Sequence, residues 1–294
     1  MEQKIIYEDE YLLVVDKPYG TTVNRSDTTK GEKTLQDWVE EYLRVPRVSR
    51  VPKVLREEKA LDAPGTLGTR DTFLDRAGPP ATHAFALRAG IVHRLDKETS
   101  GILLVAKTKD AFENLQKQFK ERIVKKVYTA LAHGKVLPEV GEIKVPVGRL
   151  PWNRKRFGVV LDGRESLTRY KVIKNYSLPA RNASPAGQRL ALSGRQSDAG
   201  GNSNLYTLLE LYPETGRTHQ IRVHLKYINH PIFADYLYAG RKTSRDDRKF
   251  LPRVFLHASK ISFQHPSSGE VVSFESPLPK ELKEFLDGLL PAGV

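Results

Sequence analysis

The hydrophobic positions of this chain follow two patterns: short apolar or alternating runs, and repeats of three and four residues. Runs of the first kind are typical of strands, and they occupy residues 5–16, 100–107, 126–132, 205–211, 253–263 and 270–274. Repeats of the second kind are typical of amphipathic helices, and they occupy residues 34–43, 110–124, 218–228 and 279–290. Because the two kinds are mixed without strict alternation, the pattern favours an α+β fold over a doubly wound sheet.

Local signals support two of the predicted helices. Thr34 and Asp37 are spaced as a capping box in which Asp replaces the usual Glu. Asp110 and Glu113 are spaced in the same way at the start of the second helix. The apolar face of that helix is formed by Phe112, Leu115, Phe119 and Ile123. Both helices are therefore expected to begin at these polar residues.

The charge of the chain indicates the kind of partner it binds. Its 294 residues include 48 Lys and Arg against 35 Asp and Glu, a formal net charge of +13. Such an excess favours a polyanion, either nucleic acid or an anionic membrane surface. The absence of cysteine excludes disulfides, zinc–thiolate sites, iron–sulfur clusters and cysteine nucleophiles. With no signal-peptide pattern and no apolar run near the ~20 residues that span a bilayer, we expect a cytoplasmic protein that binds RNA or DNA and no membrane.

Two segments interrupt the regular patterns. Residues 44–89 contain several prolines and predict an insertion, and basic residues recur at every third position from 44 to 59. A polyproline-II segment has three residues per turn and would align these charges on one edge. The insertion is thus either an arm that follows an RNA backbone or a solvated basic segment. Residues 177–204 are rich in Gly, Ser, Ala, Pro and Asn and predict a long surface loop.

The most informative stretch is HRLDKETSG at residues 93–101, which places an Arg and an Asp in a short loop before a buried strand. On spacing alone it has two interpretations. Asp and Ser often stabilise turns, and neighbouring Arg and Asp often form a surface ion pair worth ~0–1 kcal/mol. The same residues could also form a catalytic site, and the local pattern does not decide between the two.

The longer stretch HRLDKETSGILLVAK, at 93–107, resembles the signature of the RluA-type family of RNA pseudouridine synthases. Other stretches resemble further motifs of that family in the same order. They are LVVDKPYG at 13–20, KVYTAL at 126–131, TGRTHQIRVHL at 215–225, HPI at 230–232, LHA at 256–258 and HP at 265–266. The resemblance covers about two thirds of the chain.

This resemblance implies a reaction, the isomerisation of specific uridines in ribosomal RNA or tRNA to pseudouridine. Asp96 would be the nucleophile and would attack either uracil C6 or ribose C1′ of the target. Arg222 would pair with Asp96 and keep it ionised, because a nearby cation lowers a carboxyl pKa. Tyr128 would stack on the target base, and its hydroxyl would take the C5 proton or orient the group that does. Its alternative role is aromatic packing between strands.

The resemblance also implies substrate or RNA-binding residues: Arg94, His93, Arg217 and His219. Arg94 would hold the target nucleotide out of its stack, and His93 has a structural hydrogen-bonding role as its alternative. A helical wheel places Arg222 at the edge of the buried face of its helix. The isomerisation adds no outside group and the histidines lack metal-ligand spacing. The resemblance therefore implies no cofactor and no metal, and we expect a monomer.

The fold implied is a single pseudouridine-synthase catalytic domain over residues 1–294. It would be α+β, with a mixed, mostly antiparallel sheet, flanking helices and a central basic cleft. The first strand begins by Ile5, which leaves no room for the N-terminal S4-type domain that many members carry. Ala234 stands where the family usually has Gly, which leaves the geometry of its loop open.

Two other functions remain possible at this point. A catalytically silent RNA-binding or ribosome-assembly factor could use the same scaffold, and loss of Asp96, Tyr128 or Arg222 would favour it. None of these residues is lost. A glycoside hydrolase would need a second carboxylate across a cleft, for which Glu98 and Asp235 are the candidates.

Overall fold

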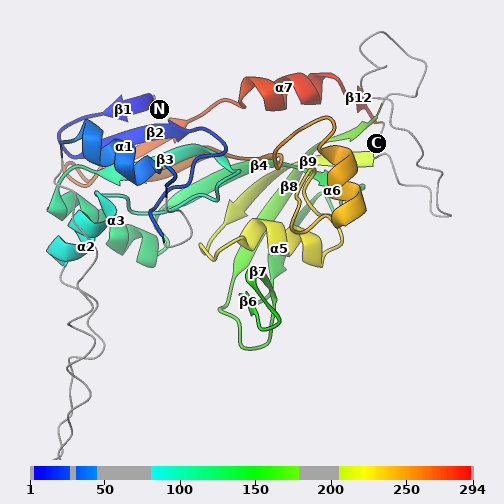
Figure 1. The fold of residues 1–294 in the computed structure, drawn as a ribbon, viewed down its shortest axis with the longest axis horizontal. Coiled ribbons are helices and arrows are strands. Elements are labelled where there is room, and N and C mark those ends of the chain that lie inside the picture. The colour runs from blue at the N-terminus through cyan, green and yellow to red at the C-terminus, as the bar shows by residue number, and fades with distance from the viewer. Residues whose placement is uncertain (1–2, 27–30, 45–80, 179–204, 293–294) are drawn as a thin grey trace, which may run out of the picture.

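The computed structural model describes residues 3–26, 31–44, 81–178 and 205–292. Its main feature is a ten-stranded sheet with the order β1–β2–β3–β10–β4–β9–β8–β12, in which β11 also pairs with β10 and β5 with β8. These strands are β1 (Lys4–Glu8), β2 (Leu12–Lys17), β3 (Ser100–Ala106), β4 (Lys125–His133), β5 (Val140–Lys144), β8 (Leu167–Ser177), β9 (Leu205–Pro213), β10 (Leu256–Gln264), β11 (Val271–Glu275) and β12 (Leu290–Pro291). Strands β6 (Val147–Leu150) and β7 (Asn153–Val159) form a separate hairpin that projects from the body (Figure 1).

Helices lie on both sides of the sheet. They are α1 (Leu35–Tyr42), α2 (Ala81–Arg88), α3 (Lys109–Lys120), α5 (Gln220–Tyr227), α6 (Arg241–Asp247) and α7 (Lys280–Asp287). In the view of Figure 1, α7 lies at the top of the molecule, and α2, α3 and the β6–β7 hairpin lie in its lower half. Among the described strands, only β3 and β10 pair in parallel. The predicted α+β fold with a mostly antiparallel sheet is confirmed. None of the described helices has the length and apolar character needed to cross a bilayer.

Strand β3 is buried along its whole length because helices cover both of its faces. Leu104 clusters with Phe112 of α3 on one face, and Leu103 clusters with Leu35 of α1 on the other. A strand covered on both sides reads as a continuous apolar run rather than an alternation. This explains why residues 101–106 form a continuous apolar run in the sequence.

The two predicted helix starts have different outcomes. Thr34 caps α1 as expected: its side chain accepts a hydrogen bond from the Asp37 N–H, and the Asp37 carboxylate accepts one from the Thr34 N–H. The prediction for α3 is wrong by two residues. Thr108 is its cap and accepts from the Ala111 N–H, which leaves Asp110 in the first turn. This helix ends at Lys120, earlier than the apolar spacing predicted.

Two helices were missed because tertiary packing rather than apolar spacing stabilises them. Helix α2 lies at the end of the 44–89 insertion, where no helix was expected, and its Phe85 meets Phe112 of α3 edge to face at 5.7 Å. Helix α6 is seven residues of mostly polar side chains. The basic repeat at 45–59 and nearly all of the loop at 177–204 lie outside the described residues.

The parallel pairing of β3 with β10 brings distant parts of the chain together at the centre of the sheet. Gly101 lies opposite Ala258 in that pair. A Cβ at position 101 would lie 2.2 Å from the Ala258 carbonyl oxygen, and the φ of 112° is unfavourable for other residues. On the other edge of β10, Ala258 lies opposite Tyr128 of β4. Tyr128 therefore lies in the same row of the sheet as the start of β3, which follows Asp96 by a few residues.

Candidate active site

Asp96 lies in a tight turn that is anchored to the first strands of the sheet. The Thr99 N–H donates to the Asp96 carbonyl at 3.1 Å, and the Gly20 N–H donates to the Lys97 carbonyl at 2.7 Å. The fully buried Lys17 ammonium donates to the same Lys97 carbonyl at 3.3 Å. The LVVDKPYG motif therefore supplies the groups that hold the Asp96 turn in place.

Arg222, on α5, connects Asp96 to a second carboxylate. Its Nη1 donates to Asp96 Oδ2 at 3.0 Å, while Nε and Nη2 donate to the two oxygens of Asp235 at 2.7 and 2.9 Å. Asp235 is fully buried, and Arg222 is 4% exposed. Arg222 lines the pocket beside Asp96, as its place at the edge of the buried face predicted, but it is more deeply buried than the helical wheel indicated, and Asp235 compensates its charge. Paired in this way, the guanidinium has a fixed direction toward Asp96.

The surroundings of Asp96 favour its ionised form. Burial raises the pKa of the carboxyl, but His219, Arg222 and Arg94 together outweigh burial and lower the pKa below its ordinary value. Only one carboxylate oxygen accepts a hydrogen bond from Arg222. The side chain remains 19% exposed. Asp96 is therefore an accessible, permanently anionic group at neutral pH.

A pocket of about 110 Å³ opens beside Asp96. Six of the seven predicted site residues line it, and they are Asp96, Tyr128, Arg222, Arg94, Arg217 and His219. Burial, reinforced by Asp96, raises the pKa of Tyr128 above its ordinary value, so its hydroxyl stays protonated at neutral pH. Residues from three separate motifs thus surround one small cavity.

His93 is the exception, because it lines a neighbouring cavity instead. Its Nε2 accepts a hydrogen bond from the Leu104 N–H at 3.0 Å, and its ring packs against Phe119 at 5.0 Å. Burial, with a smaller contribution from Lys126, lowers the pKa of His93 to about 3. A neutral ring that accepts a backbone hydrogen bond fits the structural alternative for this residue.

A family model described as RNA pseudouridylate synthase matches residues 11–227, which is more than half of the chain. The chain belongs to this pseudouridylate synthase family.

Relatives in the pseudouridylate synthase family match nearly the whole chain. Ribosomal large subunit pseudouridine synthase D of Neisseria meningitidis is 34% identical, over 100% of this chain and 63% of its own length. The uncharacterised RNA pseudouridine synthase YlyB of Bacillus subtilis is 37% identical, over 100% and 75%. The chain thus spans less than two thirds of the length of synthase D. The human RNA Pseudouridylate Synthase Domain Containing 1 structure shares the fold, with a TM-score of 0.62, 24% identity and coverage of 99% of this chain and 89% of that one.

The family pattern drew attention to Ala234, and the structure shows what this departure means. Ala234 has a φ of 60°, a left-handed conformation that Gly adopts freely and that costs other residues ~1–2 kcal/mol. The loop therefore keeps the backbone that Gly would favour. Its neighbour Asp235 accepts from the N–H groups of Leu237 and Tyr238 at 3.0 and 3.2 Å, which holds the loop closed around Arg222.

Two contacts of the candidate site were not found from the sequence. Asp235 was considered only as a second acid, and its pairing with Arg222 depends on a loop outside the recognised motifs. Tyr238 was missed entirely, although its hydroxyl lies 2.8 Å from His219 Nδ1 and Arg222 lies 5.0 Å from its ring centroid. The only sequence signal for either residue was the stretch FADYLYAG at 233–240. Nothing in that stretch singles out Tyr238 from Tyr236.

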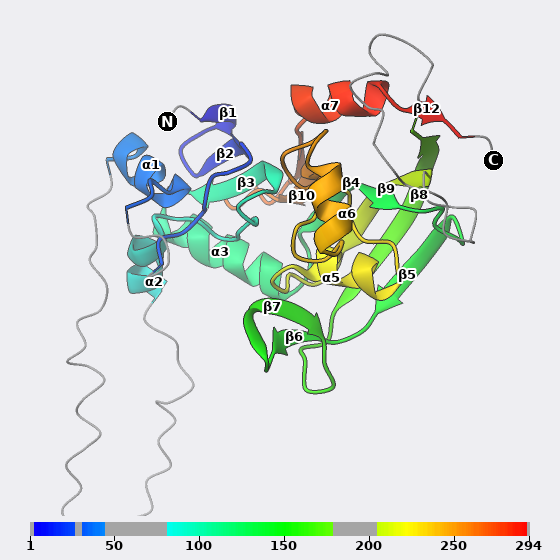
Figure 2. The ribbon, with the colours of Figure 1, turned by 45° about the vertical axis from the view of Figure 1, so that its right-hand side comes forward.

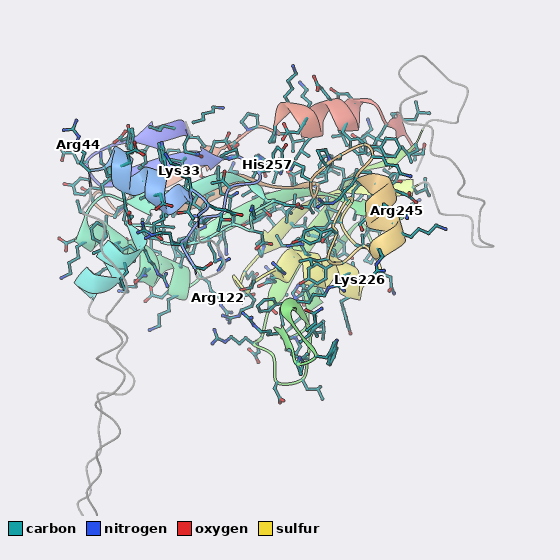
Figure 3. All side chains as sticks on the ribbon, viewed as in Figure 1. Lys33, Arg44, Arg122, Lys226, Arg245 and His257 are labelled. Carbon is teal, nitrogen blue, oxygen red and sulfur yellow. The ribbon has the colours of Figure 1, made fainter. Side chains whose placement is uncertain are left out.

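A second cavity of about 810 Å³ adjoins the pocket and shares Arg94, Lys126, Tyr128 and Arg217 with it. Figure 3 shows Arg122 between α3 and the β6–β7 hairpin. The cations that line this cavity are Arg25, Arg88, Arg94, Lys120, Arg122, Lys126 and Arg217. Except for Arg25, which pairs with Asp37 and Glu40, none of them forms an ion pair with another described residue. The cavity therefore presents uncompensated positive charge beside Asp96.

Both candidates for the second carboxylate of a glycoside hydrolase are engaged elsewhere. Asp235 is fully buried against Arg222, and Glu98 pairs with Arg248 at 2.5 Å. Neither lines the pocket beside Asp96. Within the described ranges, no three His, Asp or Glu side chains are grouped as metal ligands would be.

Proposed function

We propose that this chain is an RNA pseudouridine synthase, an isomerase that converts specific uridines in RNA to pseudouridine. The observation that carries the proposal is the placement of Asp96, which is ionised, held through one oxygen by Arg222 and open to a pocket lined by Tyr128 and His219. A single accessible carboxylate in a cationic pocket suits covalent catalysis on an electrophilic carbon.

In the proposed reaction, Asp96 forms a bond to C6 of uracil or to C1′ of ribose. The N1–C1′ bond breaks, the base rotates, and a new C5–C1′ bond forms. The C5 proton is lost, N1 gains a proton, and Asp96 is released as a carboxylate. The product has the same atoms as the substrate, so no co-reactant is consumed.

Tyr128 is proposed to stack on the target base and to orient the group that removes the C5 proton. Its raised pKa favours this role, because a phenol that stays protonated at neutral pH is a weak base. Arg94 is exposed at the mouth of the pocket. We propose that it occupies the space left by the extruded uridine, since base extrusion costs a few kcal/mol and an arginine can offset part of that cost.

The RNA class is proposed to be large-subunit ribosomal RNA rather than tRNA. Synthase D of Neisseria meningitidis and of Nitrosomonas europaea are named for the large ribosomal subunit, and each is more than 30% identical to this chain. The unpaired cations beside the pocket fit a phosphate backbone. The role of the 44–89 insertion, the single-domain organisation and the monomeric state remain predictions.

The direct test is pseudouridine mapping, because the isomerisation leaves the mass of the RNA unchanged. Unmodified transcripts of large-subunit ribosomal RNA are incubated with the protein, labelled with carbodiimide and read by reverse transcription. Stops at defined uridines are expected, with none in bulk tRNA transcripts. Tight RNA binding with no stops in free RNA or in ribosomal particles would favour the catalytically silent factor instead.

The cavity beside the pocket predicts a specific change in salt dependence. Replacing both Arg88 and Arg122 with Gln should remove two phosphate contacts. Each contact contributes about 0.7–0.9 to the slope of log K against log salt concentration, so the slope should become shallower by about 1.5. Binding of a ribosomal RNA fragment is measured at several salt concentrations.

The control for this prediction replaces Lys280 and Lys283 with Gln, two exposed cations on α7 that do not line this cavity. The slope should not change in that variant. Equal slopes for the wild type and the Arg88–Arg122 variant would show that the cavity does not contact the RNA backbone.

A further inference from the structure

We propose that Tyr238 is a positioning residue that holds the His219 imidazole with its Nε2–H directed at Asp96, and that the base of the β6–β7 hairpin supports this arrangement. The consequence for activity rests on the proposed function, whereas the hydrogen-bond arrangement does not. His219 is the residue before α5 and has a φ of 58°. Its Nδ1 lies 2.8 Å from the Tyr238 hydroxyl, and its Nε2 lies 3.8 Å from Asp96 Oδ1.

The direction of the Tyr238–His219 hydrogen bond follows from the other partner of the hydroxyl. The Phe157 N–H of β7 donates to the Tyr238 oxygen at 3.1 Å, so that contact uses a lone pair and not the hydroxyl proton. Tyr238 is 7% exposed, and a buried hydroxyl needs an acceptor for its proton. Among the described contacts of this hydroxyl, His219 Nδ1 is the available acceptor. Tyr238 therefore donates to Nδ1, and the neutral ring carries its proton on Nε2.

The ring is neutral at neutral pH because of its surroundings. Burial lowers the pKa of His219, and Arg222 and Arg94 lower it further against the opposite effect of Asp96 and Asp235. The tautomer that Tyr238 selects then matters for Asp96. An Nε2–H directed at the carboxylate is attractive, whereas an Nε2 lone pair in its place would repel the same anion.

The geometry also distinguishes the two oxygens of Asp96. Oδ2 accepts from Arg222 at 3.0 Å, while Oδ1 lies beyond hydrogen-bond distance of His219 Nε2. Oδ1 is therefore the oxygen left free to attack, and His219 presents a donor next to it. A fixed donor at this place stabilises charge that develops beside the nucleophile without having to reorient.

The hairpin contributes to the same arrangement. The Phe157 ring meets the His219 ring edge-on at 5.5 Å. Tyr238 clusters with Val147 and Phe157 of the hairpin and with Val223 of α5. Figure 2 shows the hairpin close to α5. The backbone N–H that orients the Tyr238 hydroxyl thus comes from an element outside the main sheet.

The first test replaces Tyr238 with Phe, which keeps the ring and removes the donor. The single-turnover rate of pseudouridine formation should fall by ~10- to 100-fold, a usual cost of losing a partner that orients a functional imidazole. RNA affinity should change by less than about twofold, since the change leaves the cationic surface intact. Tyr236→Phe, the same change at a half-exposed position two residues earlier, should have no effect.

A readout independent of activity is the ¹⁵N spectrum of the histidine rings. The His219 signals, assigned by their loss in His219→Gln, should report Nε2–H in the wild type and a mixture of tautomers in Tyr238→Phe. An unchanged tautomer would overturn the proposal, even if the wild type made no pseudouridine and the proposed function failed.

Two substitutions of His219 distinguish the role of its Nε2 from that of its Nδ1. Gln places an N–H near the Nε2 position, and Asn places one only near Nδ1. Gln should retain more activity than Asn, although the left-handed backbone at this residue favours Asn. In the His219→Gln background, Tyr238→Phe should lower the single-turnover rate little further, because Gln has no tautomers for Tyr238 to select. An equal loss in both backgrounds would show that Tyr238 acts independently of His219.

Discussion

Replacing Asp96 with Asn is expected to lower the rate of pseudouridine formation by at least ~10⁴-fold, the scale on which loss of a nucleophile acts. The amide has nearly the same shape but cannot form the covalent bond that starts the reaction. Arg222 keeps its two hydrogen bonds to Asp235, so the buried cation stays compensated and the fold is retained. RNA affinity should change by less than about threefold, because the cations that line the neighbouring cavity are untouched.

The comparison is made by single-turnover mapping with excess protein, together with a binding titration on the same RNA. Asp287→Asn is the matched control: it is the same substitution at an exposed position on α7, and it should leave the rate unchanged. Thermal unfolding of both variants should match the wild type. An Asn variant with a rate near that of the wild type would show that Asp96 is not the nucleophile.

The parts of the site that were predicted from the sequence are those whose chemistry lies within one motif. Asp96 and Arg222 each stand in a stretch that resembles a family motif, so both were named from the resemblance. Lys17 was recognised as part of a motif, but the motif did not show that its ammonium would bind the Lys97 carbonyl. Burial and Arg253 lower its pKa to about 7, and its hydrogen bond to Lys97 spans 80 positions of sequence.

The parts that were not predicted depend on contacts between distant segments. The parallel pairing of Gly101 with Ala258 joins residues far apart in the chain, and no local pattern encodes such a register. Asp235 follows the left-handed backbone of Ala234 in the loop that approaches Arg222, and Tyr238 depends on its contact with Phe157 of the β6–β7 hairpin. The motifs that resemble the family's therefore point to Asp96, while the groups that surround it become visible only when the sheet is assembled.

Replacing Arg222 with Lys is expected to lower the rate by ~10²- to 10³-fold, the usual effect of losing one preorganised donor to a reacting group. A Lys ammonium keeps the charge opposite Asp235, which is fully buried. A neutral residue there would leave that carboxylate without its cationic partner, at a cost of ~3–5 kcal/mol in stability. Lys cannot donate to Asp235 and Asp96 in the bidentate manner of a guanidinium, so the contact with the nucleophile is lost.

The same change predicts the direction of a pH effect. Burial raises the pKa of Asp96, and Arg222 is one of the groups that lower it. Loss of its hydrogen bond should raise that pKa, so that the nucleophile is protonated at higher pH and the acid limb of the rate profile moves upward. Single-turnover rates across the acidic range measure this shift, with the exposed Arg169 changed to Lys as the control. An acid limb that stays in place would mean that Arg222 positions Asp96 without setting its ionisation.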